Sequence, residues 1–97
     1  MKFEWDDAKA SSNLKKHKVS FEDASSVFSD QYHLSIPDDF HSDEEDRWIS
    51  IGSTTEKLIL ITVVHTYRDE DDNEVIRIIS ARKATTKEKR EYLNRRR

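Results

Sequence analysis

The chain has 97 residues, enough for one small domain with a single core, and we treat residues 1–97 as that domain. Charged residues make up 38% of it and hydrophobic residues 34%, but the apolar residues come in short runs, which favours a folded domain over disorder. The lack of cysteine and the single glycine, Gly52, exclude disulfides, thiolate zinc sites and glycine-rich phosphate loops, so no cofactor is expected. The N-terminus lacks the apolar core of a signal peptide, and the longest apolar run, Leu58–Val64, is too short to span a membrane, so we expect a cytoplasmic protein.

The first part of the chain predicts one strand and two helices. Lys2–Trp5 is typical of a short edge strand. Asp6 or Asp7 can cap a helix that runs to about His17, where lysines suit the helix C-terminus. Ser20 can cap a second helix. Its buried face is predicted from four apolar residues at helical spacing: Phe21, Ala24, Val27 and Phe28.

Four strands follow the two predicted helices. Tyr32–Ile36 alternates as a strand does and is ended by Pro37, after which Asp38–Asp46 carries six carboxylates and should form an exposed loop. The other three predicted strands are Arg47–Ser53, Lys57–Arg68 and Val75–Ala81. The first half of Lys57–Arg68 is apolar on both faces, which indicates a central strand, and Asp69–Glu74 is the expected hairpin loop after it.

The last predicted element is a basic helix that begins at a capping box, Thr85-x-x-Glu88. Residues 75–97 hold nine Lys or Arg and two Glu, whereas residues 1–74 hold eight Lys or Arg and eighteen Asp or Glu. A basic C-terminal segment on an acidic body is typical of a protein that binds a polyanion or an acidic partner. A solvated helix would explain the same charges equally well. The element order β-α-α-β-β-β-β-α predicts the α+β class, with an antiparallel sheet packed against helices.

The histidines and carboxylates do not predict a metal site. Four histidines occur without ligand-type spacing: His17, His33, His41 and His65. The acidic segment around His41 is better read as a solvated loop than as a cation site.

Cleavage of RNA through attack of its 2′-hydroxyl needs no metal, but it needs proton-transfer groups and fixed positive charge on the phosphorane. The candidates for proton transfer are His17, His65, Tyr67 and Tyr92. The candidates for fixed charge are Arg47, Arg68, Arg77, Arg82 and Lys83. Each has an ordinary alternative, because surface arginines usually form ion pairs, His17 can interact with a helix dipole, and His65 can be a hydrogen-bonded core residue.

Strand alternation limits how these cations can combine. It places Arg77 and Arg82 on opposite faces of one strand, so they cannot serve one site unless a bulge intervenes. Arg82, at the strand exit, is the stronger candidate for a catalytic role. A ribonuclease therefore stays one hypothesis among several at this point.

Four segments, taken together and in order, resemble the BrnT family of bacterial type II toxins. These segments are FEWDDAKASSNLKKHKVSFEDASSVF, EDRWISIGST, HTYR and RIISARKATTKEKREY, and they cover nearly the whole chain. The resemblance implies a RelE-like fold and an endoribonuclease that arrests growth. It also implies a cognate BrnA-like antitoxin with a ribbon-helix-helix domain, through which alone the complex would contact operator DNA.

This resemblance leads to a set of assignments. We predict that Arg82 and Arg68 stabilise the phosphorane and that His17 and Tyr92 transfer protons. The residues predicted to bind RNA are Lys83, Arg47, Arg77 and Lys16. The alternative is a non-catalytic module, a degenerate toxin or autoregulatory subunit, that only binds nucleic acid or a partner.

Two features depart from the family pattern. Many members carry glycine after the histidine, where this chain has Lys18, and a lysine with positive φ there costs roughly 1 kcal/mol. The segments Asp38–Asp46 and Asp69–Glu74 are unusually acidic, and they would repel RNA if either borders the site.

Overall fold

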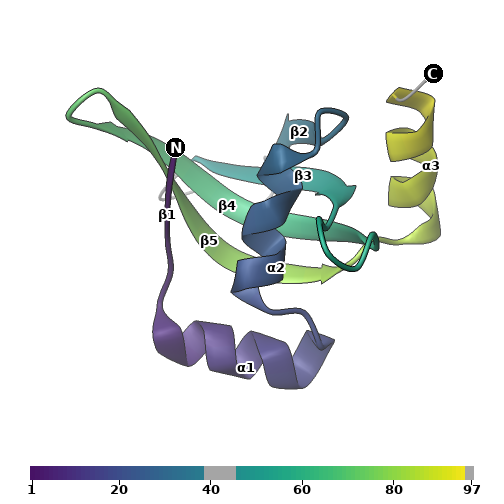
Figure 1. Ribbon diagram of the computed structural model, residues 1–97, viewed down its shortest axis with the longest axis horizontal. Coiled ribbons are helices and arrows are strands. Elements are labelled where there is room, and N and C mark those ends of the chain that lie inside the picture. Colours follow the sequence, from purple (N-terminus) through teal and green to yellow (C-terminus); the bar gives the residue numbers. More distant parts are fainter. Residues whose placement is uncertain (39–45, 96–97) are drawn as a thin grey trace.

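The computed structural model describes residues 1–38 and 46–95, which form three α-helices and a five-stranded sheet (Figure 1). The strands are β1 Lys2–Glu4, β2 Leu34–Pro37, β3 Arg47–Ser53, β4 Leu60–Glu70 and β5 Asn73–Lys83. The helices are α1 Asp7–His17, α2 Phe21–Ser26 with the 3-10 turn η1 Val27–Ser29, and α3 Thr86–Arg95. The α+β class predicted from the sequence is confirmed. None of these helices is long and apolar enough to cross a membrane.

The strand order is β1-β5-β4-β3-β2, which makes β4 central and β1 an edge strand, as predicted. Strands β2 to β5 form an antiparallel meander, but β1 pairs parallel with β5. The expectation of a wholly antiparallel sheet is therefore wrong at this edge. Parallel neighbours need a long connection, and everything from α1 to β4 lies between these two strands.

The predicted helix starts are confirmed in atomic detail. Asp6 accepts a hydrogen bond from the N–H of Lys9 at 3.0 Å, and Ser20 accepts one from the N–H of Asp23 at 3.0 Å. The capping box before α3 is reciprocal, because Thr85 Oγ1 accepts from the Glu88 N–H at 3.2 Å and Glu88 accepts from the Thr85 N–H at 2.8 Å. These bonds satisfy N–H groups that a helix leaves unpaired at its start.

Helix α1 ends at Lys18, whose φ of 60° and ψ of 28° are left-handed. Its N–H donates to the carbonyl of Leu14 at 3.0 Å, which closes the last turn. The position after His17 therefore needs a positive φ, and this chain fills it with a residue that carries a Cβ.

The hairpin between β4 and β5 is tighter than expected. Asp71 and Asp72 both have positive φ, 52° and 65°, which suits the two-residue turn that matches strand twist. The strands consequently extend into the predicted loop Asp69–Glu74. At the other acidic segment, Asp38 is buried, with its N–H bonded to the Arg47 carbonyl at 2.8 Å, contrary to the exposed loop expected there. The rest of that prediction, residues 39–45, lies outside the described residues.

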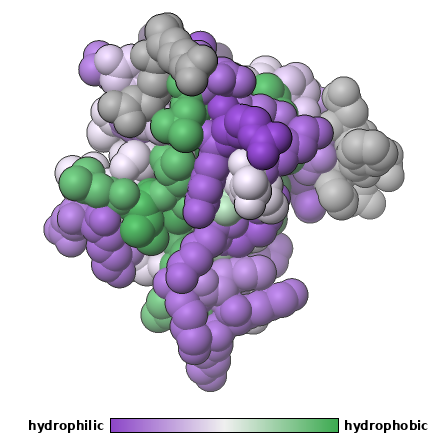
Figure 2. All heavy atoms as spheres, turned by 90° about the vertical axis from the view of Figure 1, so that its right-hand side faces the viewer, coloured by the Kyte–Doolittle hydropathy of each residue, from purple (hydrophilic) through white to green (hydrophobic). Residues whose placement is uncertain are grey.

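Two apolar clusters occupy the two faces of the sheet. In Figure 1, α2 crosses one face of the sheet with α1 below it, and α3 stands apart beside the far end. The helix face Phe21, Ala24, Val27 and Phe28 is buried against Ile61, Val63, Ile76, Ile78 and Ala81. On the opposite face, Tyr92 of α3 packs with Ile51, Ala84 and partly buried neighbours. Figure 2, which views the α3 side, shows that apolar atoms also reach the surface there.

Candidate functional site

The site begins with an irregularity in β5. Val64 of β4 pairs with Ser80, but the next residue, His65, pairs with Ile78, so Ile79 is an extra residue in the strand. Such a bulge resets the alternation of side chains. Arg77 lies opposite Thr66 before the bulge and Arg82 lies opposite Thr62 after it.

Both arginines consequently lie on one face of the sheet. Ile78 before the bulge and Ala81 after it belong to the core beneath α1 and α2, so their neighbours Arg77 and Arg82 face away from those helices. The expectation from strict alternation, that these two arginines lie on opposite faces, is wrong because of Ile79. Thr66 and Thr62 are four residues apart, which separates the two arginines by about 13 Å along the strand.

Asn13 holds the bulge from the side of α1. Its Nδ2 donates to the carbonyls of Ala81 at 2.8 Å and Val19 at 3.0 Å, and its Oδ1 accepts from the Ala81 N–H at 3.2 Å. Because β1 pairs with β5 only as far as Arg77, this amide takes the place of a strand further along the same edge. The sequence analysis missed Asn13. Asparagine is a weak helix former, so its place on the inner side of a predicted helix is a signal that its side chain has a structural role.

The arginine face continues across three strands. Arg47 of β3 lies opposite Thr66, which lies opposite Arg77 on its other side. Arg68 follows two residues after Thr66 and so points to the same face. We name the set Arg47, Arg68, Arg77 and Arg82 the arginine face. Within residues 1–38 and 46–95, α3 is the only helix packed on this side of the sheet.

Glu4 holds the arginines at one end of this face. Its carboxylate accepts hydrogen bonds from both Arg68 terminal nitrogens and from Arg77 Nη1, the last at 3.4 Å. The hydrogen bonds from Arg68, with a smaller contribution from Arg77, lower the pKa of Glu4 to about 2. Arg68 also donates to Glu70 at 2.9 Å. These ion pairs orient the guanidinium groups before any ligand binds.

Glu88 of α3 plays the same part for Arg82. Two guanidinium nitrogens donate to its two oxygens at 2.7 and 3.0 Å, and Thr62 Oγ1 donates to Oε1 at 2.9 Å. Although burial opposes it, this set of donors lowers the pKa of Glu88 to about 2. Arg82 is thus fixed in a bidentate pair at the end of the face nearest α3.

His17 and Lys16 lie at the edge of β5 beside the bulge. Both line a shallow pocket together with Lys9, Ser12, Asn13, Ile79 and Ser80. The bulge lies between Arg77 and Arg82 along the strand, so His17 and Lys16 lie beside the stretch of β5 that joins these two arginines.

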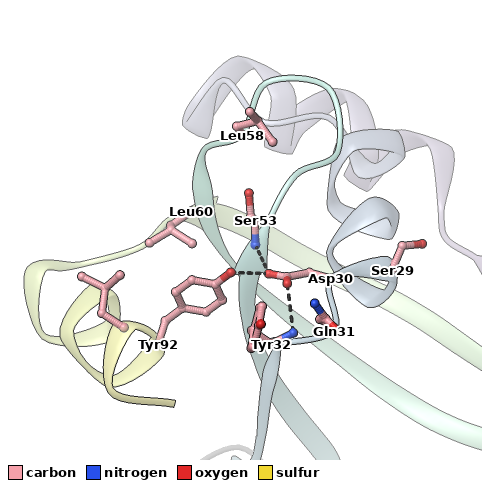
Figure 3. Close-up of a pocket in the computed structure, with 9 residues that line it drawn as sticks. Ser29, Asp30, Gln31, Tyr32, Ser53, Leu58, Leu60 and Tyr92 are labelled. Atoms are coloured by element: carbon pink, nitrogen blue, oxygen red, sulfur yellow. Dashed lines mark hydrogen bonds between the residues drawn. The ribbon is translucent and has the colours of Figure 1, made fainter. Parts of the chain in front are cut away.

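Two other predicted site residues lie elsewhere. The Tyr92 hydroxyl donates to Asp30 Oδ2 at 2.6 Å, in a pocket between η1 and α3 (Figure 3). Lys83 is exposed and lines a separate pocket with Leu58, Leu60 and Lys89. The structure therefore does not group Tyr92 or Lys83 with His17.

His65 is a core residue, which is one of the two roles that the sequence left open for it. Its side chain is fully buried, its Nε2 lies 2.6 Å from Ser50 Oγ, and the rings of Phe28 and Tyr67 meet it edge-on with centroids at 4.8 Å. Burial lowers the pKa of His65 to about 4. A neutral histidine in the core has no access to a substrate.

Metal ligands do not gather in this part of the structure. Among residues 1–38 and 46–95, no three His, Asp or Glu side chains lie close enough together to hold a metal ion. The arginine face itself presents guanidinium groups held by ion pairs to Glu4 and Glu88.

Comparison with known families assigns the chain. A family model described as the ribonuclease toxin BrnT of type II toxin-antitoxin systems matches residues 5–88. The chain belongs to the BrnT family. The family resemblance stated from the sequence is confirmed, whereas curated proteins give no match. The matched range includes the bulge, the arginine face and Glu88, but Tyr92 lies beyond it.

Proposed function

We propose that this BrnT toxin is a metal-independent endoribonuclease whose RNA substrate lies along β5, over the arginine face. The observation that carries the proposal is the bulge at Ile79, because it puts Arg77 and Arg82 on one face with His17 at the edge between them. Arginine binds phosphate in planar, bidentate fashion, and its charge is independent of pH in the physiological range.

The proposed reaction divides the work between the histidine and the arginines. His17 takes the proton from the ribose 2′-hydroxyl, whose oxygen then attacks the adjacent phosphorus. The bond to the 5′-oxygen breaks, this oxygen takes a proton from water, and a 2′,3′-cyclic phosphate remains. Arg77 and Arg82 stabilise the phosphorane, in which negative charge accumulates, so Arg77 takes the role that the sequence analysis gave to Arg68. Arg68, Arg47 and Lys16 bind neighbouring phosphates.

The carboxylates that hold these arginines do not preclude phosphate binding. The Arg68 and Arg77 side chains keep 46% and 43% of their surface exposed while paired with Glu4. An RNA phosphate carries a similar charge in a similar geometry and can replace a carboxylate on the open side. We assign no part in this step to Tyr92, whose hydroxyl is bonded to Asp30, or to Lys83, which lines a pocket with Leu58, Ile59 and Leu60.

The wider assignment follows from the family. A type II toxin has a protein antitoxin as its partner, and we propose a BrnA-like ribbon-helix-helix protein that alone contacts operator DNA. The toxin acts in the cytoplasm, where it cleaves RNA and arrests growth. The antiparallel meander, with α1 and α2 on one face and α3 on the other, supports a RelE-like fold.

The test combines purified protein with growth. Wild type, Arg82→Ala, Arg77→Ala and Arg90→Ala are incubated with RNA in the presence of EDTA, and each is induced in a bacterial host. Arg90 is an exposed arginine of α3 outside the site and is the matched control. We expect cleavage with 2′,3′-cyclic phosphate ends, lowered about 10²- to 10³-fold by Arg82→Ala or Arg77→Ala and unchanged by Arg90→Ala.

Three outcomes would contradict the proposal in different ways. Cleavage abolished by EDTA would contradict metal independence. Full cleavage by folded Arg82→Ala and Arg77→Ala proteins would remove the arginine face from the site. Salt-dependent RNA binding by wild type without any cleavage would favour the non-catalytic module instead.

A further inference from the structure

We propose that the surface between the β3–β4 turn and α3 is the docking site for an acidic, amphipathic segment of the antitoxin. The surface consists of Leu58, Ile59, Leu60 and Leu93, and we name it the leucine groove. The inference rests on the proposed toxin function, because it takes the antitoxin as the partner.

Leu58 is the first observation behind this proposal. The residue is 77% exposed and its φ is 54°, a left-handed conformation that costs conformational energy for any residue with a Cβ. The turn is fixed around it, because the Leu58 N–H donates to the Thr54 carbonyl at 3.1 Å and Thr54 is itself buried. A large apolar side chain held in a strained, exposed position is typical of a binding residue.

The groove beside Leu58 has apolar walls, and the carboxylate at its base has hydrogen-bond partners within the protein. Leu60, Leu93 and Tyr92 line it, and Leu93 is 51% exposed (Figure 3). At the base, the Asp30 carboxylate accepts from the Ser53 N–H at 2.9 Å, the Tyr32 N–H at 3.0 Å and the Tyr92 hydroxyl at 2.6 Å. Apolar side chains of a partner can therefore enter without leaving the Asp30 carboxylate unpaired.

The rim of the groove is basic, which indicates the charge of the partner. Lys83 and Lys89 line the adjoining pocket with Leu58, Ile59 and Leu60, and both lysines are exposed. On α3, the carboxylate of Glu88 is already engaged by Arg82. In Figure 2 the apolar atoms form a band bordered by hydrophilic atoms. A helix with apolar residues on one side and carboxylates at its flanks complements this surface.

The position of the groove also links it to the arginine face. Helix α3 contributes Leu93 to the groove and, through Glu88, holds Arg82 at the end of the arginine face. A partner seated against α3 lies beside Arg82 and blocks the path of RNA there. Neutralisation of the toxin follows from docking without any partner residue in the site.

The experiment compares two groove variants with a matched control. Leu58→Gly removes the side chain and suits the positive φ, and Leu93→Ser changes an exposed helix residue. The control is Leu14→Ser, because Leu14 is 49% exposed on α1, on the far side of the core from α3. The probe is the protein encoded by the adjoining reading frame, purified and titrated into each toxin variant by calorimetry.

We expect Leu58→Gly and Leu93→Ser each to raise the dissociation constant at least tenfold, and Leu14→Ser to change it less than twofold. Lys89→Glu should weaken binding and reduce its dependence on salt. In RNA cleavage without antitoxin, Leu58→Gly and Leu93→Ser should match wild type, but antitoxin should inhibit them less.

Several results would overturn the docking site without touching the ribonuclease. They are wild-type affinity in both groove variants, no binding of the adjoining protein to wild type, or a toxin homodimer that Leu58→Gly dissociates. Failure of the proposed activity is separate, because it would appear as a lack of RNA cleavage by the free wild type.

Discussion

Arg82 and Glu88 form a bidentate ion pair, 2.7 and 3.0 Å between their nitrogens and oxygens, that fastens α3 to the sheet. Glu88 Oε1 also accepts hydrogen bonds from Thr62 of β4 at 2.9 Å and from the Thr85 N–H at 2.8 Å. One carboxylate therefore joins two strands to the first turn of the last helix. Any test of Arg82 in catalysis also perturbs this junction.

Glu88 should stabilise the folded protein through this junction. We expect Glu88→Gln to lower the free energy of unfolding by about 1 kcal/mol at pH 7, a modest value because the ion pair is partly exposed. The pKa of Glu88 is depressed to about 2, so its contribution is complete above the usual 4.5 and is lost as the pH falls towards 2. Urea unfolding between pH 2 and 7 measures this, with Glu91→Gln as control. A difference between wild type and Glu88→Gln that is the same at pH 2.5 and pH 7 would contradict it.

His65 should make stability depend on pH over a higher range. Its pKa is lowered from 6.5 to about 4 in the folded state, so the unfolded chain binds the extra proton between these values. Stability should be complete above pH 6.5 and fall by roughly 3 kcal/mol as the pH drops to 4. His65→Gln, which does not titrate, should remove most of this slope in thermal or urea unfolding. If the stability of His65→Gln depended on pH as steeply as that of wild type, other titrating groups would be responsible for the dependence.

Lys18 offers a stabilising substitution. Because its φ is 60°, we expect Lys18→Gly to raise the free energy of unfolding by about 1 kcal/mol. Lys15→Gly, within α1, should instead lower the free energy of unfolding by about 1 kcal/mol. Chemical denaturation of both variants measures the pair. A loss of stability in Lys18→Gly would show that the lysine side chain makes a contribution larger than the backbone strain.

Asn13 should be essential to the bulge. Asn13→Ala leaves the N–H and carbonyl of Ala81 and the carbonyl of Val19 without this hydrogen-bond partner. The first buried group left unsatisfied costs about 1–3 kcal/mol of folding stability. We expect a loss of about 3 kcal/mol and faster hydrogen exchange of the Ala81 amide, measured by NMR. Ser12→Ala, on an exposed neighbour, is the control. An Ala81 amide that stays protected in Asn13→Ala would mean that the bulge does not need the asparagine.

Glu4 should restrain RNA binding, since it competes for Arg68 and Arg77. We expect Glu4→Gln to tighten binding of single-stranded RNA about two- to fivefold, the equivalent of one exposed ion pair. The salt dependence should steepen by about 0.7 in the logarithmic slope for each further phosphate that the released arginines neutralise. Fluorescence anisotropy at several salt concentrations measures both, with Glu22→Gln on α2 as control. Weaker binding by Glu4→Gln would indicate that Glu4 orients the arginines more than it blocks them.

The features that the sequence predicted correctly are those set by neighbours along the chain. The caps at Asp6, Ser20 and Thr85 act on N–H groups three residues away, so the residue type and its spacing are sufficient to predict them. The family could be recognised for the same reason, because its motifs are short segments of fixed spacing. The candidate arginines were also visible, but only as residue types without a common position.

Only the tertiary structure decided which of those residues meet. The bulge at Ile79 lies two residues before Ala81, to which Asn13 is hydrogen-bonded from 68 positions away in the chain, and without this bulge strand alternation would separate Arg77 from Arg82. Tyr92 is turned to Asp30, 62 positions away, and so leaves the predicted site. The pattern of a strand fixes the face of a side chain only while the pairing is regular. Here the extra residue Ile79 changes the pairing, beside a segment to which a distant helix is joined by buried hydrogen bonds.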